Sequence, residues 1–165
     1  MRLSEESHAR LEQFFGWYGR DEKLRLPLMF IHAGFFSHHL TRVLRIAAIT
    51  IGRHIFVSRV YLERDERGRL TIQGGLLAHE AAHVRQFQRE GFLPFLYNYL
   101  REYVTFLFRT GKLNATARRA AYEQITREQE AREVEAAYLE WRLNGVTHHG
   151  VETVLSRNRR LIPAP

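Results

Sequence analysis

The chain has 165 residues, 45% of them hydrophobic and 12% aromatic, so it can bury the core of one domain and is too apolar to be disordered throughout. It contains no cysteine, which excludes disulfides and thiolate metal sites and leaves His, Asp and Glu as metal ligands. The formal charge of +7 is almost entirely arginine, but the arginines form no continuous run, so no specific nucleic-acid partner is expected.

The N-terminal part of the chain is expected to contain one amphipathic helix over residues 4–19. Ser4 can cap its start, and apolar side chains recur at helical spacing: Leu11, Phe14, Phe15 and Tyr18. Residues 1–20 are polar and acidic before they become amphipathic, which is not the order of a secretory signal. The cytoplasm is therefore the default expectation.

The next part of the chain changes from an apolar stretch to short β-branched runs. Residues 28–44 are apolar with three histidines, and the length of this stretch favours a helix over a strand. Between residues 45 and 72, Gly52 and the cluster at 65–68 separate runs rich in Ile and Val. Short β-branched runs separated by turn residues predict a small antiparallel β-meander. This meander is expected to be the only sheet of the fold.

Helices are expected for most of the remaining chain. One is predicted over residues 76–89, closed by Gly91, and a second over residues 94–109. Residues 115–143 are rich in Ala, Glu and Arg, and the sequence TREQ from Thr126 has the form of a capping box that can restart a helix. The expected fold class is α+β, mostly helical, with the meander preceding helix 76–89.

The chain is expected to form a single domain over residues 1–147, followed by a loosely docked tail. Residues 148–165 lack periodicity and end in Leu-Ile-Pro-Ala-Pro. Residues 24–36 and 92–108 are apolar, but the first stretch is short and two charges interrupt the second, so neither supplies the roughly 20 apolar residues of a spanning helix. The oligomeric state is not indicated.

The motif His79-Glu-Ala-Ala-His83 lies on the predicted helix 76–89. Residues four apart lie on one face of a helix, so both imidazoles can face one metal ion. Glu80 lies roughly 100° further around the axis, where its carboxylate can act as the general base on a metal-bound water. Zinc lowers the pKa of such a water to about 7, so the motif predicts a zinc-dependent hydrolase.

A catalytic zinc ion takes three protein ligands, so one ligand must come from elsewhere in the chain. Arg89 stands where the metzincin pattern requires a third histidine, which leaves a glutamate from a later helix. Glu128 falls in the first turn after Thr126. Residues two apart on a helix cannot both face the metal, so Glu128 and Glu130 exclude each other as ligands. We favour Glu128, which shares a helix face with Ala131 and Glu135, over Glu130 or Glu135.

Several other side chains could serve such a site. Gln86 lies three residues after His83 and can either hydrogen-bond a ligand or the base, or satisfy backbone groups in the core. A peptidase also needs a group that stabilises the carbonyl oxygen, and the sequence does not rank the candidates, which are Tyr122, Arg132, His148 and His149. Residues 92–108 are more apolar than one buried face requires, and are expected to pack on the motif helix, line a substrate groove or touch a membrane surface.

Residues 76–91 (LLAHEAAHVRQFQREG) and residues 127–131 (REQEA) resemble the bacterial HExxHxxQ metallopeptidase family. The likeness extends over roughly residues 46–138. It implies a gluzincin-like, zincin-type domain that acts on a peptide or protein substrate. It also implies the roles of four residues: Zn²⁺ ligands His79, His83 and Glu128, and general base Glu80. The chain departs from the family at residues 125–127, where Ile-Thr-Arg replaces the usual Asn-Pro-Phe.

The leading expectation is therefore zinc-dependent hydrolysis of peptide bonds. One alternative is a zinc-binding module without proteolytic activity, which interacts with or delivers a partner. Another is a basic protein in peripheral contact with a membrane, in which case the motif is coincidental.

Overall fold

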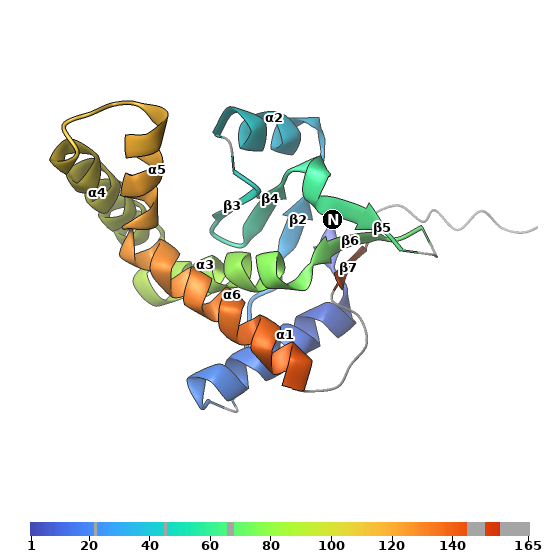
Figure 1. Cartoon of the computed structure of the whole chain (residues 1–165). Coiled ribbons are helices and arrows are strands. Elements are labelled where there is room, and N and C mark those ends of the chain that lie inside the picture. The colour runs from blue at the N-terminus through green and yellow to red at the C-terminus, as the bar shows by residue number, and fades with distance from the viewer. Residues whose placement is uncertain (22, 45, 66–67, 145–150, 156–165) are drawn as a thin grey trace, which may run out of the picture.

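The computed structural model describes residues 1–21, 23–44, 46–65, 68–144 and 151–155. These residues form one sheet with helices packed around it (Figure 1). The helices are α1 (Glu5–Gly19), α2 (Phe35–Leu44), α3 (Gly74–Glu90), α4 (Phe92–Arg109), α5 (Ala115–Glu123) and α6 (Thr126–Asn144), with a 3₁₀ turn at Arg59–Tyr61. The strands are β1 (Arg2–Leu3), β2 (Phe30–His32), β3 (Ala48–Ile51), β4 (His54–Val57), β5 (Leu62–Arg64), β6 (Leu70–Gln73) and β7 (Val151–Leu155). The predicted α+β class is confirmed.

The sheet is larger than the predicted meander and has a different topology. Its strand order is β3-β4-β2-β1-β7-β6-β5, and all neighbours are antiparallel except β2 and β4. The strands between residues 45 and 72 thus form two hairpins, β3-β4 and β5-β6, at opposite ends of the sheet. The 3₁₀ turn at Arg59–Tyr61 separates the hairpins, and strands from both ends of the chain lie between them.

Three segments that were not predicted as strands complete the sheet. One of them, Arg2–Leu3, is strand β1, which pairs with β2 and β7. Residues 28–44 were expected to be helical throughout, but Phe30–His32 is strand β2, and the helix begins at Phe35. A three-residue strand is too short to show a period of two. Within the predicted tail, Val151–Leu155 is strand β7, which pairs with β1 and β6. The rest of that tail, residues 148–150 and 156–165, lies outside the described residues.

Helix α3 is the central element of the core and packs along α6. Its motif residues are flanked by Leu77, Ala78 and Ala81, all fully buried. A Cβ added to Gly75 would lie 3.2 Å from Leu139 Cδ2 and 3.4 Å from Glu135 Cγ. The absence of a side chain there therefore lets α6 approach the first turn of α3 closely.

Helix α1 packs against the C-terminal half of α6. Phe14, fully buried on α1, meets Tyr138 of α6 edge to face, with ring centroids 5.0 Å apart. Helices α4 and α5 stand together at the end of the molecule away from the β5-β6 hairpin (Figure 1). Among the described residues, no helix is long and apolar enough to cross a membrane.

Candidate metal centre

Helices α3 and α6 bring together the three side chains predicted to be metal ligands. The Nε2 atom of His79 lies 3.4 Å from Glu128 Oε2, and the Nε2 atom of His83 lies 3.4 Å from Glu128 Oε1. One ligand atom from each residue lies within 4.8 Å of the other two. We call these three residues the metal triad.

The geometry of the metal triad fits a tetrahedral metal ion. Ligand atoms about 2.0–2.1 Å from zinc at tetrahedral angles lie about 3.3 Å apart. Each histidine Nε2 lies 3.4 Å from one oxygen of the Glu128 carboxylate, His79 from Oε2 and His83 from Oε1. The donor set of two imidazoles and one carboxylate suits zinc and several other divalent ions. Glu130 and Glu135, the alternatives to Glu128, do not belong to the triad.

Each histidine of the metal triad is oriented by a hydrogen bond to its outer ring nitrogen. His79 Nδ1 lies 3.2 Å from Glu135 Oε2, and His83 Nδ1 lies 2.8 Å from Gln86 Oε1. An imidazole that donates from Nδ1 directs its Nε2 lone pair toward the metal. Glu135 and Gln86 are therefore positioning residues.

Gln86 connects His83 to the first turn of α6. Its Nε2 donates to the backbone carbonyl of Arg127 at 3.0 Å and to Glu130 Oε2 at 2.7 Å. Arg89 donates to the same Glu130 carboxylate. Gln86 thus has both of the roles that the sequence left open, since it bonds a ligand histidine and also satisfies a backbone carbonyl.

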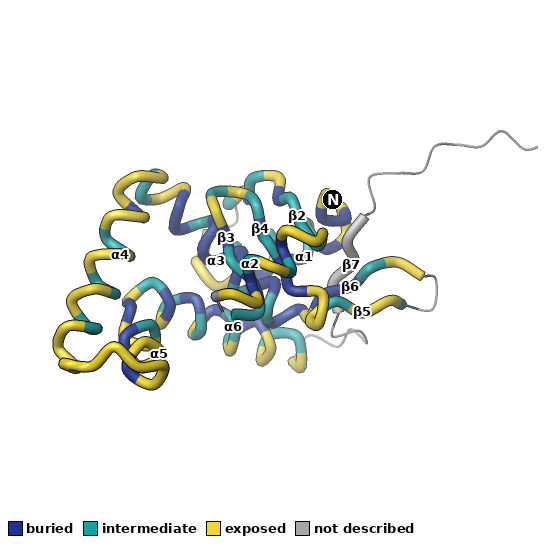
Figure 2. Tube along the Cα trace, turned by 90° about the horizontal axis from the view of Figure 1, so that it is seen from above, coloured by how far each residue is buried: buried dark blue, intermediate teal, exposed yellow. Residues whose placement is uncertain are grey.

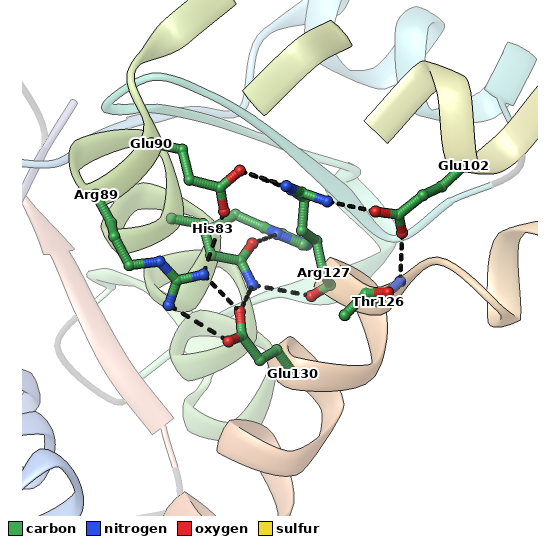
Figure 3. Close-up of polar contacts among 8 residues, drawn as sticks. His83, Arg89, Glu90, Glu102, Thr126, Arg127 and Glu130 are labelled. Carbon is green, nitrogen blue, oxygen red and sulfur yellow. Dashed lines mark hydrogen bonds and ion pairs between the residues drawn. The ribbon is translucent and has the colours of Figure 1, made fainter. Parts of the chain in front are cut away.

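The start of α6 is held by Arg127, which lies between two carboxylates (Figure 3). Its guanidinium donates to Glu90, the last residue of α3, and to Glu102 Oε1 of α4 at 2.7 Å. The other oxygen of Glu102 accepts the backbone N–H of Thr126 at 2.8 Å. The predicted cap at Thr126 is therefore wrong, because Thr126 is the first residue of α6 and a carboxylate from α4 takes its N–H.

Two tyrosines from α4 and α5 close the carboxylate side of the metal triad. Tyr99 donates to Glu128 Oε1 at 2.8 Å, and Tyr122 donates to Glu128 Oε2. Burial, together with the charge of Glu128, raises the pKa of both phenols, so both remain neutral donors. Tyr99 was not predicted because it lies within a long apolar run that gives no sign of a polar partner.

The structure describes two of the four residues that were candidates for stabilising the carbonyl oxygen of a substrate. Tyr122 lies at the metal triad but donates to Glu128. Arg132 donates to the backbone carbonyl of Glu123 and is directed elsewhere. His148 and His149 lie outside the described residues.

Glu80, the predicted general base, is buried beside the metal triad with 3% of its surface exposed. Its Oε2 accepts a hydrogen bond from Thr50 Oγ1 of β3 at 2.6 Å. Burial raises the pKa of Glu80, although the nearby histidines and the Thr50 bond oppose the shift. A raised pKa makes a carboxylate a better proton acceptor. Thr50 could not be predicted, because its contact with Glu80 spans 30 residues.

Without a bound metal ion, His79 of the metal triad is protonated at neutral pH. Burial lowers the pKa of His79, but hydrogen bonds to Glu128 and Glu135 outweigh it and raise this pKa to about 9. Burial likewise opposes ionisation of Glu128, yet hydrogen bonds from His79 and His83 hold its pKa well below its usual range. The metal-free site is thus an ion pair at neutral pH.

Metal affinity is expected to rise with pH until about pH 9. His79 must release its proton to bind a metal ion, and although burial lowers the pKa of His83, hydrogen bonding to Glu128 outweighs it and raises this pKa as well. Apparent affinity should therefore increase at least about tenfold for each pH unit below the pKa of His79. The metal-free fold should show the opposite trend: stability contributed by the raised pKa of His79 is complete below about pH 6.5 and is lost as the pH rises through 9. Competition with a chromophoric chelator between pH 6.5 and 9.5 measures the affinity. Glu135→Gln should shift the rise to lower pH, and an affinity that is constant between pH 7 and 9 would contradict the assignment.

The chain was compared with family models, curated proteins and solved structures. The eCIS core domain model matches residues 2–91, more than half of the chain, from β1 to the residue after α3. The match includes His79, Glu80 and His83 but ends before Glu128. No curated protein and no solved structure gives a significant match. The matched model differs from the HExxHxxQ family that the motif resembles, and by this match the chain belongs to the eCIS core domain family.

Proposed function

We propose that this protein is a zinc-dependent metallopeptidase. The observation that carries the proposal is the metal triad itself, in which two imidazole Nε2 atoms each lie 3.4 Å from the Glu128 carboxylate, with Glu80 buried beside them. Three nitrogen and oxygen ligands are typical of catalytic rather than structural zinc sites. Bound there, zinc would polarise a carbonyl group and lower the pKa of a water molecule.

The residues around the triad suit this chemistry. Glu135 and Gln86 hold the ligand imidazoles with their Nε2 atoms directed inward. Glu80 can accept a proton, since burial raises its pKa and Thr50 fixes its carboxylate. The resemblance of residues 76–91 to the HExxHxxQ family supports the same assignment.

Strand β3 supports a peptide as the substrate. It lies against α3 and pairs with β4, and in the described part of the chain its other edge has no partner (Figure 1). An extended peptide can add to such an edge through main-chain hydrogen bonds. Because Thr50 of β3 contacts Glu80, a peptide on this edge would run beside the proposed base.

A zinc-binding module without catalytic activity is the second candidate. The observation that favours it is the enclosure of the site: Glu80 and Glu128 are each 3% exposed, and two tyrosines cover the Glu128 carboxylate. In that case the metal would chiefly hold α3 to α6.

The variant Glu80→Gln distinguishes the two candidates. If Glu80 is the base, the substitution should lower peptide cleavage by about 10²–10⁴-fold and leave about one zinc ion per chain bound. Cleavage is measured on a library of fluorescence-quenched peptides, and zinc by elemental analysis. Glu133→Gln, on the exposed side of α6, is the matched control and should change neither quantity.

Either of two results would remove the peptidase proposal. One is zinc-loaded protein that cleaves no peptide of the library. The other is cleavage that Glu80→Gln leaves unchanged. Unfolding by a chelator without any cleavage would instead support the non-catalytic module.

A further inference from the structure

Helix α4 is apolar on two opposite faces. Its inner face carries Phe95, which is 5% exposed and lies 3.9 Å from Phe87 between ring centroids, and Tyr99, which reaches the metal triad. Helix α4 also packs on α5, and its Glu102 bonds Arg127 and the N–H of Thr126. None of these contacts involves the opposite face of the helix.

The outer face of α4 is a continuous apolar stripe exposed to solvent. It consists of side chains three or four residues apart, with their exposed fractions: Leu93 (73%), Tyr97 (65%), Leu100 (51%), Val104 (44%) and Phe108 (74%). Figure 2 shows α4 largely exposed along its length. Monomeric proteins rarely expose a contiguous stripe of this kind without a partner.

The charge around this stripe is strongly positive. Residues 92–122 contain five cations and one acid; the cations are Arg101, Arg109, Lys112, Arg118 and Arg119. The acid, Glu102, faces inward, where it bonds Arg127 and the N–H of Thr126. The next residue, Glu123, is exposed and pairs with Arg119. The other four cations accompany the stripe without an exposed carboxylate between residues 92 and 122.

The positive charge around the stripe favours some binding partners over others. A second copy of the chain would place like charges opposite each other, which disfavours a symmetric dimer through α4. Apolar side chains combined with Lys and Arg are the combination by which a helix binds in the plane of an anionic bilayer. An acidic protein groove would satisfy the charge but requires a matching cleft for a stripe of five residues.

We infer that the outer face of α4 and the turn to α5 dock on the surface of an anionic lipid bilayer. Leu93, Leu100 and Phe108 would enter the headgroup region, and the cations would contact lipid phosphates. The helix would lie in the plane of the membrane, since no described helix can span one. This surface shares no residue with the metal triad, so the inference is independent of the proposed peptidase activity.

Sedimentation with lipid vesicles tests the inference. The full-length protein should pellet with vesicles of phosphatidylcholine and phosphatidylserine at low salt, and more weakly with phosphatidylcholine alone. The double variant Leu93→Glu and Phe108→Glu should lower binding by at least about 100-fold, because each side chain contributes about tenfold or more when buried. Lys112→Glu should lower it at least about fivefold.

A matched control separates the stripe from general surface hydrophobicity. Val60→Glu replaces a side chain that is 78% exposed on a different element and should leave vesicle binding unchanged. Unchanged thermal unfolding midpoints show that the variants remain folded. Absence of binding to anionic vesicles, or equal loss in Val60→Glu, would overturn the inference. So would a concentration-dependent dimer that the Leu93 and Phe108 substitutions abolish, since a second copy would then cover the stripe.

Discussion

Zinc is expected to raise the thermal unfolding midpoint of the metal-free protein by about 5–10 °C when the free ion is about 100-fold above its dissociation constant. At that excess, binding to the folded state alone contributes about 2.7 kcal/mol, and a domain of this size gains about 2–4 °C per kcal/mol. The metal triad joins α3 to α6, so the effect should appear in the cooperative unfolding of the whole domain. Differential scanning calorimetry with and without a chelator measures it.

The matched variants Glu128→Gln and Glu130→Gln locate this effect. Both residues lie in the first two turns of α6, but Glu128 contacts both histidines of the triad, whereas Glu130 bonds Gln86 and Arg89. Glu128→Gln should abolish the zinc-dependent shift, because an amide is a poor zinc ligand. Glu130→Gln should retain it. Equal loss in both variants would show that the third ligand is misassigned, and no shift in the unaltered protein would refute the metal centre.

Replacing Arg127 by Met is expected to lower the free energy of unfolding by about 3–5 kcal/mol. The side chain is 12% exposed and forms ion pairs with Glu90 and Glu102, whose side chains are 17% and 20% exposed. Its guanidinium also lies 5.7 Å from the Phe95 ring centroid. Removing it leaves two largely buried carboxylates without their cation, and urea denaturation measures the loss.

The same substitution should weaken metal binding. Arg127 immediately precedes Glu128, and its carbonyl accepts from Gln86, which in turn orients His83. Arg119→Met is the matched control, because Arg119 is 82% exposed and its ion pair with Glu123 is screened by solvent, so its loss should change stability little. A stability loss no larger than that of the control would show that Arg127 does not fix the start of α6. Arg127→Lys should recover part of both losses, since it restores the charge but not the paired geometry.

The spacing of the histidines in the sequence was enough to predict the part of the candidate site that lies on α3. His79 and His83 share a face of any helix that contains them, and α3 was predicted within a few residues of its actual bounds. The choice of Glu128 also followed from position, since it lies in the first turn of α6 and Glu130 points elsewhere. The third-ligand prediction agrees with the geometry, although metal binding itself stays a prediction.

Only the tertiary structure decided how the site is completed. Thr50, Tyr99 and Glu135 reach it from β3, α4 and the middle of α6, across sequence separations of 29 to 56 residues. The sheet order was equally non-local, because β7 pairs with β1 and β6 from the other end of the chain. Helical periodicity is set by neighbours within four residues and is visible in the sequence, whereas strand pairing and buried hydrogen bonds depend on packing between distant segments.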